Sequence, residues 1–113
     1  MRQLTFLKPG RFEWREVPAP VVSGPRHAVV RPLAVARCDL DLYIATGVAP
    51  FAGPFAFGHE AVCEVVDAGD AAGVVPGQRV VVPFQISCGD CENCRRGFTN
   101  SCSGVPAYAA YGL

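Results

Sequence analysis

The sequence predicts a mainly β protein, and three features support this expectation. Its 12 glycines and 10 prolines are spread along the 113 residues and divide the apolar segments into short runs. Short runs bounded by turn residues suit strands better than long helices. Several of these runs also alternate in polarity or are rich in valine, as strands are. A chain of this length has enough material for one domain with one sizeable core.

The first predicted element is a hairpin that joins residues 4–7 to residues 12–17. The segment between them, Lys8-Pro9-Gly10-Arg11, contains a proline and a glycine that supply the dihedral angles of a turn. Three further runs are expected to form the main strands of a barrel: residues 27–36, rich in Val, Leu and Ala, residues 61–66, which alternate, and residues 79–86, which follow a Pro-Gly turn.

One short helix is expected over residues 39–46, where apolar side chains recur at helical spacing. An aspartate lies in its first turn, and Gly47 follows its last residue, where glycine commonly ends helices. Residues 48–58 are rich in Pro, Gly, Ala and Phe and are predicted to form a loop within the domain.

The charge balance argues against two classes of partner. Ten basic residues match ten acidic ones, so the charge does not indicate binding to nucleic acid or to an anionic membrane. No apolar run approaches the length of a membrane span, and the N-terminal residues do not resemble a secretory signal. We therefore expect a cytoplasmic protein whose partner is a small molecule or another protein surface.

The strongest motif is CxxCxxCx7C, and its members are Cys88, Cys91, Cys94 and Cys102. Structural zinc sites use four thiolates at tetrahedral positions, and two-residue gaps let neighbouring cysteines face one ion. Such a site is closed and leaves no position for a substrate. Its predicted role is to hold together residues 88–102, the cysteine lobe, which is too small and polar to fold by apolar burial alone.

Two other interpretations of the cysteine lobe remain open at this point. Disulfides are rare in reducing compartments, and no secretion signal favours them here. The first three cysteines share the spacing of bacterial ferredoxins, but that pattern has its fourth cysteine sooner and followed by proline, whereas Ser103 follows here. Because four-cysteine lobes also occur in zinc ribbons without catalysis, the lobe alone does not establish an enzyme.

Two alternatives to an enzyme therefore stay open for the whole protein. The first is a non-catalytic zinc-stapled β-barrel that serves as an interaction module. The second, which is less favoured, is an iron–sulfur protein.

Three further residues are candidates for a catalytic metal site. Cys38 follows one predicted strand, and His59 and Glu60 precede the next. Taken singly, a cysteine or a histidine in such a position is more often a buried small residue or a satisfied polar group. Together with the carboxylate they supply the ligand types of a catalytic zinc, provided that the fold brings them together.

Four segments in this order resemble the zinc-dependent medium-chain alcohol dehydrogenases. They are Cys38-Asp39-Leu40-Asp41 with Gly47 downstream, Gly58-His59-Glu60-Ala61-Val62, Gly77-Gln78-Arg79-Val80-Val81, and the cysteine lobe. The resemblance covers most of the chain and implies that residues 1–113 are a GroES-like β-barrel domain of the N-terminal catalytic type. It also implies that Cys38 and His59 are catalytic zinc ligands, that the carboxylate of Glu60 can approach this metal, and that the cysteine lobe holds a structural zinc.

The same resemblance implies an NAD- or NADP-dependent oxidoreductase that interconverts an alcohol or polyol and a carbonyl by hydride transfer. Members of the family carry a Rossmann domain after the barrel segment, but no GxGxxG motif occurs here. We therefore expect that the cofactor binds through a domain absent from this chain, that a further zinc ligand lies beyond Leu113, and that this fragment alone is inactive. Whether the full-length enzyme forms a homo-oligomer stays open.

The chain departs from the family pattern beside Cys38, the cysteine that the resemblance implies is a catalytic zinc ligand. Members commonly have Ser or Thr two residues after that cysteine and often His three residues further on, forming a proton relay. Leu40 and Tyr43 occupy these positions here. Tyr43 is therefore a candidate relay residue, and the alternative is that its ring packs against the barrel. Cys63 replaces a common glycine and is predicted to be a small buried residue rather than a ligand.

Overall fold

The computed structural model describes residues 1–106 and contains two antiparallel three-stranded sheets. The first sheet has the order β2-β1-β4, formed by β1 (Arg2–Lys8), β2 (Arg11–Glu16) and β4 (Phe55–Ala56). The second has the order β3-β5-β6, formed by β3 (Ala28–Val35), β5 (Ala61–Ala68) and β6 (Arg79–Val82). The prediction of a mainly β protein is confirmed.

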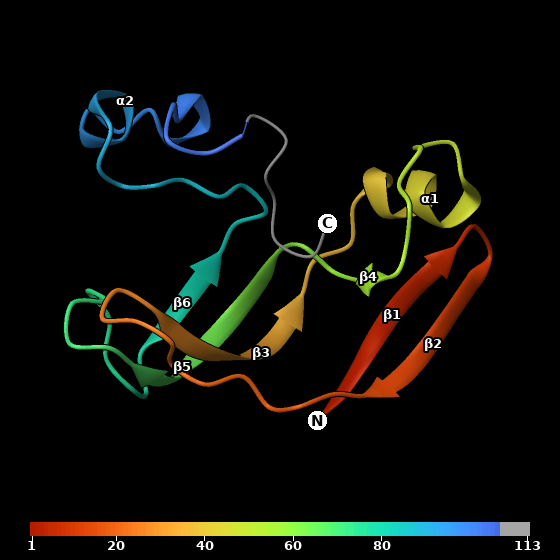
Figure 1. The fold of residues 1–113 in the computed structure, drawn as a ribbon, viewed down its shortest axis with the longest axis horizontal. Helices are drawn as coiled ribbons and strands as arrows, with labels where there is room; N and C mark the ends of the chain where they lie inside the picture. The colour runs from red at the N-terminus through yellow and green to blue at the C-terminus, as the bar shows by residue number, and fades with distance from the viewer. Residues whose placement is uncertain (107–113) are drawn as a thin grey trace.

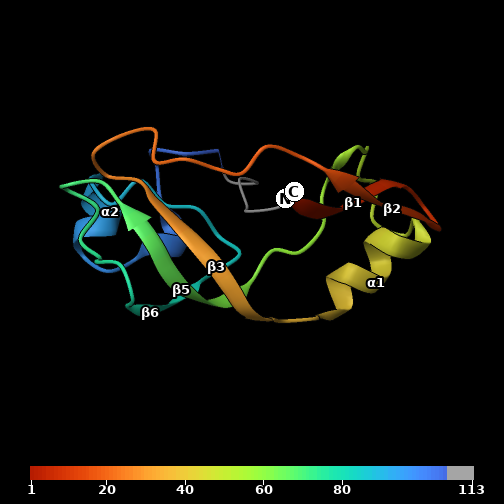
Figure 2. The same ribbon diagram turned by 90° about the horizontal axis from the view of Figure 1, so that it is seen from below.

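The two sheets lie side by side in a flattened molecule, as Figures 1 and 2 show. The helix α1 (Asp39–Thr46) lies beside the first sheet. The short helices α2 (Glu92–Arg95) and η1 (Thr99–Ser101) lie in the cysteine lobe, beyond the end of β6 (Figure 1). With eight residues, α1 is the longest helix among those described and is far shorter than a membrane span requires.

The predicted N-terminal hairpin is confirmed. Strands β1 and β2 pair in register from Arg2 opposite Glu16 to Phe6 opposite Phe12. Gly10 lies in the turn with a φ of 73°, in the left-handed region that glycine adopts without a steric penalty. The Pro-Gly signal therefore marked the correct turn.

The three predicted main strands are also present, although their ends differ from the expectation. Strand β6 ends at Val82 rather than at residue 86, because Pro83 follows and has no N–H to donate to a ladder. The segment predicted as a loop, residues 48–58, contains the two-residue strand β4. Its pairing with β1 places Ala56 opposite Thr5.

The helix α1 has the predicted bounds, and its two ends explain them. Cys38 is the N-cap residue, and its backbone N–H donates to Oδ2 of Asp41 at 2.8 Å. Gly47 follows the helix with a φ of 82°, and its N–H donates to the carbonyl oxygen of Ile44. Capping of this kind satisfies backbone groups that the helix cannot pair internally. It also fixes Cys38 and Asp41 relative to each other.

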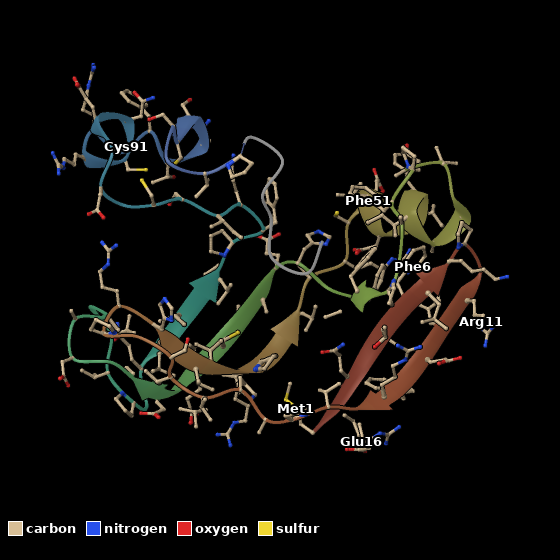
Figure 3. The ribbon with its side chains drawn as sticks, in the orientation of Figure 1. Met1, Phe6, Arg11, Glu16, Phe51 and Cys91 are labelled. Atoms are coloured by element: carbon tan, nitrogen blue, oxygen red, sulfur yellow. The ribbon has the colours of Figure 1, made fainter. Side chains whose placement is uncertain are left out.

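The first sheet and the helix α1 beside it contain two fully buried side chains, Phe6 and Ile44. Phe6 is labelled in Figure 3. Its ring lies against the rings of Phe12, Phe55 and Phe57, with centroids 5.0 to 6.4 Å apart. Full burial of such a side chain contributes about 1.5–3 kcal/mol. In the second sheet Cys63 is only 1% exposed, which confirms its prediction as a buried residue. The aromatic cluster anchors the segment that leads into His59.

Candidate metal centres

The cysteine lobe brings its four thiols to one point. The sulfur atoms of Cys88, Cys91, Cys94 and Cys102 all lie within 4.8 Å of one another. Zinc–sulfur bonds of about 2.3 Å in a tetrahedron place the sulfur atoms roughly 3.8 Å apart, so the cluster has the size of a four-thiolate site. Figure 3 shows sulfur atoms gathered inside the turn that carries Cys91. Local structure explains this, because Cys91 caps α2 and Cys94 lies within that helix.

Backbone N–H groups surround these sulfur atoms. Cys91 donates to Sγ of Cys88 at 3.3 Å, and Cys88 donates to Sγ of Cys102 at 3.4 Å. Gly104 donates to the same Cys102 sulfur at 3.3 Å. Gly104 must also be small, because a Cβ atom there would lie 2.7 Å from Sγ of Cys88. Hydrogen bonds of this type stabilise thiolates over thiols.

The pKa shifts of three thiols in the lobe favour a bound cation. The backbone N–H of Cys94 is the main cause that lowers the pKa of Cys91 to about 5, and the backbone N–H of Cys88 lowers the pKa of Cys102. Burial raises the pKa of Cys94 to about 12, and the neighbouring Cys91 adds to this shift. A divalent metal offsets this cost by neutralising the thiolates. None of the six cysteines, all of them in the described part of the chain, forms a disulfide.

A second cluster contains Cys38, Asp41 and His59, whose candidate ligand atoms also lie within 4.8 Å of one another. Sγ of Cys38 is 3.3 Å from Nε2 of His59. A zinc ion bound tetrahedrally by one sulfur and one nitrogen separates those two atoms by roughly 3.6 Å. The structure therefore brings together the two residues predicted as catalytic ligands, and a shift of a few tenths of an ångström admits a zinc ion between them.

The fold creates this second cluster by joining the end of β3 to the start of β5. The N–H of Ala36 donates to the carbonyl oxygen of Glu60 at 2.9 Å, which ties the two segments together. His59 is 6% exposed, whereas Cys38 is exposed. The ring of Phe84 lies edge-on to His59, with centroids 6.4 Å apart. The imidazole is therefore held from the protein side while the cysteine sulfur stays accessible.

Asp41 is the member that the sequence analysis missed. Its Oδ1 lies 3.3 Å from Nδ1 of His59, while its Oδ2 accepts the N–H of Cys38. A carboxylate on Nδ1 fixes the ring so that Nε2 faces the metal, which is the usual arrangement around metal-binding histidines. The available signal was the acidic residue three positions after the N-cap, where capping-box side chains occur.

Two roles expected from the resemblance stay predictions: that Glu60 approaches the catalytic metal and that Tyr43 relays a proton. Glu60 does not belong to the cluster around His59, but both residues line a cavity of about 220 Å³ beside the second sheet. Tyr43 is 48% exposed, and its hydroxyl forms no hydrogen bond with any described residue. Its ring is therefore only half covered by the domain. Leu40, which stands at the hydroxyl position of the family pattern, is partly buried.

Comparison with known proteins extends these observations. Residues 24–113 match the family described as alcohol dehydrogenase GroES-like domain. The chain is 38% identical over 112 residues to D-altritol 5-dehydrogenase of Agrobacterium fabrum, covering 96% of this chain and 32% of that protein. It is 37% identical over 111 residues to the NADP-dependent isopropanol dehydrogenase of Thermoanaerobacter brockii, covering 95% of this chain and 31% of that protein.

The fold matches as well. Alcohol dehydrogenase TADH from Thermus sp. ATN1 superposes with a TM-score of 0.80 at 37% identity, over 96% of this chain and 32% of that one. The chain thus spans 31% to 32% of the length of these three proteins. The GroES-like fold expected from the sequence is confirmed. The chain belongs to the family of alcohol dehydrogenase GroES-like domains, within the zinc-type medium-chain dehydrogenases.

Proposed function

We propose that this chain is the zinc-binding part of the catalytic domain of an NAD(P)-dependent oxidoreductase that interconverts an alcohol or polyol and a carbonyl. The observation that carries the proposal is the pair of Cys38 Sγ and His59 Nε2, 3.3 Å apart, with the carboxylate of Asp41 behind the imidazole. The names of two relatives, an altritol and an isopropanol dehydrogenase, support the substrate class.

In this proposal Cys38 and His59 hold a catalytic zinc. When bound, a zinc ion acts as a Lewis acid that polarises a substrate oxygen and stabilises its negative charge. His59 supplies a neutral nitrogen ligand whose orientation Asp41 fixes, and Cys38 supplies a thiolate from the exposed side of the cluster. Two ligands from this chain leave positions for a further protein ligand and for substrate. Glu60, next to His59, is the carboxylate proposed to approach this site.

The cysteine lobe has a different proposed role. Four thiolates complete a tetrahedron and exclude substrate, so its zinc would be structural. Both helices of the lobe are short, with four residues in α2 and three in η1, and metal binding would supply much of its stability.

The nicotinamide cofactor and the proton pathway belong to the same proposal. The relatives are about three times longer than this chain, and we propose that NAD or NADP binds to a domain outside it. Leu40 cannot accept a proton, so we propose that a proton released from an alcohol reaches solvent through water, Tyr43 or another group. The exposed ring of Tyr43 permits that role. The absence of disulfides among the six cysteines fits the reducing cytoplasm, which we propose as the location.

The test is NAD(P)-linked oxidation of simple alcohols and polyols by the complete protein that contains this domain. Replacing Cys38 with Ser or His59 with Asn should abolish turnover while the zinc of the cysteine lobe is retained. Cys63→Ala is the matched control, because Cys63 is the one cysteine outside both clusters. Undiminished turnover in Cys38→Ser and His59→Asn would contradict the proposal, and zinc in the lobe without any dehydrogenase activity would favour an interaction module.

A further inference from the structure

Two side-chain hydrogen bonds link the cysteine lobe to residues that precede it in the described part of the chain. Arg26 donates to Oδ2 of Asp90, and Nε2 of Gln85 donates to the carbonyl oxygen of Asn100 at 3.1 Å. The lobe's helices α2 and η1 contact each other, and Figure 1 shows the lobe standing beyond the end of β6. In the described part of the chain, one ion pair joins the lobe to the sheets, between Nη1 of Arg26 and Oδ2 of Asp90. These residues are 64 positions apart in the sequence, so the pair is a tertiary link.

Backbone hydrogen bonds hold the residues on both sides of Arg26. The N–H of Gly69 donates to the carbonyl oxygen of His27 at 2.9 Å, and the N–H of Ala71 donates to that of Pro25 at 2.8 Å. The two segments approach so closely that a Cβ atom on Gly69 would lie 2.5 Å from the carbonyl oxygen of Pro25. The loop before β3 is therefore hydrogen-bonded to the segment that follows β5, and this pairing holds the backbone on both sides of Arg26.

A cation near its sulfur atoms would stabilise the lobe once it holds a metal. A divalent ion with four thiolates carries a net charge of about −2. The two arginines within the lobe already lie near carboxylates of the lobe. Nη1 of Arg96 is 3.8 Å from Oε1 of Glu92, and Arg95 lies near Asp90. Arg26 and Cys88 line the same cavity of about 450 Å³. The pKa of Arg26 is raised, chiefly by its hydrogen bond to Asp90, with a smaller contribution from the nearby Cys88.

We propose that Arg26 is a positioning residue for the metal of the cysteine lobe. Its ion pair with Asp90 holds the lobe against the loop before β3, and its charge offsets that of the thiolates beside Cys88. The inference rests on the part of the proposed function that places a metal in the lobe, and it is independent of Cys38 and His59. Arg26 touches neither substrate nor cofactor in this role.

The experiment measures how fast the zinc-loaded protein gives up zinc to a chromogenic chelator. Arg26→Gln is compared with Arg31→Gln as a matched control. The side chain of Arg31 is 63% exposed and that of Arg26 is 64% exposed, and Arg31 is also ion-paired, with Glu64. Because the pair is exposed, we expect release about three- to tenfold faster in Arg26→Gln, at or below the 10- to 100-fold typical of groups behind metal ligands. Arg31→Gln should release zinc at the wild-type rate.

Two further readouts separate charge from packing. The difference between Arg26→Gln and wild type should shrink as salt is raised, because salt screens exposed charges. Hydrogen exchange at the lobe amides should speed up in Arg26→Gln and stay near the wild-type rate in Arg26→Lys, which retains the positive charge. Arg26→Lys also serves as the second variant in case Arg26→Gln folds poorly. Equal release rates in Arg26→Gln and Arg31→Gln overturn this inference alone. A wild-type lobe that binds no zinc overturns both this inference and the structural-zinc part of the proposed function.

Discussion

Replacing Asp41 with Asn tests how the second cluster works. The carboxylate serves two donors, the N–H of Cys38 at 2.8 Å and the imidazole of His59 at 3.3 Å, and only 8% of the residue is exposed. An asparagine oxygen can still accept the N–H of Cys38. Its NH2 group, however, would then face Nδ1 of His59 and favour the tautomer that carries a proton on Nε2. That nitrogen could no longer bind a metal.

The magnitudes follow from these contacts. Loss of a group that orients a metal-binding histidine typically weakens metal binding by about 10- to 100-fold, and we expect this range for Asp41→Asn at the second cluster. The free energy of unfolding should fall by only about 1 kcal/mol, because one hydrogen bond loses its charged acceptor and the first turn of α1 loses a negative charge.

The assay is a zinc competition titration with the cysteine lobe already loaded, combined with urea unfolding of the same samples. Asp39→Asn is the matched control, since Asp39 is an exposed carboxylate in the same helical turn. It should reproduce the loss of helix stabilisation but leave metal binding unchanged. Equal affinity of Asp41→Asn and Asp39→Asn for the second metal would refute the orienting role of Asp41.

Three shorter predictions concern the lobe and the relay. Gly104→Ala should speed zinc loss from the lobe more than tenfold, because the added carbon would lie 2.7 Å from Sγ of Cys88, and wild-type retention against a chelator would contradict this. In metal-free protein at pH 7, iodoacetamide should modify Cys91 before Cys94, since their pKa values are about 5 and about 12. Peptide mass spectrometry checks the order, and the rate at Cys91 should fall as the pH drops through about 5. In the complete protein Tyr43→Phe should alter the pH dependence of hydride transfer without changing the zinc content, and an unchanged profile excludes Tyr43 as the relay.

Local signals in the sequence were sufficient for the hairpin, α1 and the cysteine lobe. The turn at Pro9-Gly10, the glycine after Thr46 and the spacing of the four cysteines each act within a few residues of the structure they specify. Strand β4 could not be predicted in this way. It has two residues and no periodicity, and it exists because Thr5 of β1 pairs with Ala56.

The second cluster required the tertiary structure. Cys38 and His59 are 21 residues apart, and their spacing does not show that they meet. The family resemblance predicted this pair, but it directed attention to Glu60 rather than to Asp41 as the accompanying carboxylate. Asp41 contacts His59 because helix capping turns its side chain back toward Cys38, and the strand pairing of β3 with β5 brings the histidine to the same place. Neither cause can be read from the residues one by one.

The central claim is that Cys38 and His59 form a second metal site in addition to that of the cysteine lobe. Zinc stoichiometry, combined with zinc-edge X-ray absorption on the complete protein, tests it. We predict two zinc ions per chain in the wild type, with about 2.3 Å zinc–sulfur distances and additional nitrogen ligands. The double variant Cys38→Ser/His59→Ala should retain one zinc, bound by sulfur alone. Two zinc ions in that variant, or a single sulfur-bound zinc in the wild type, would contradict the account.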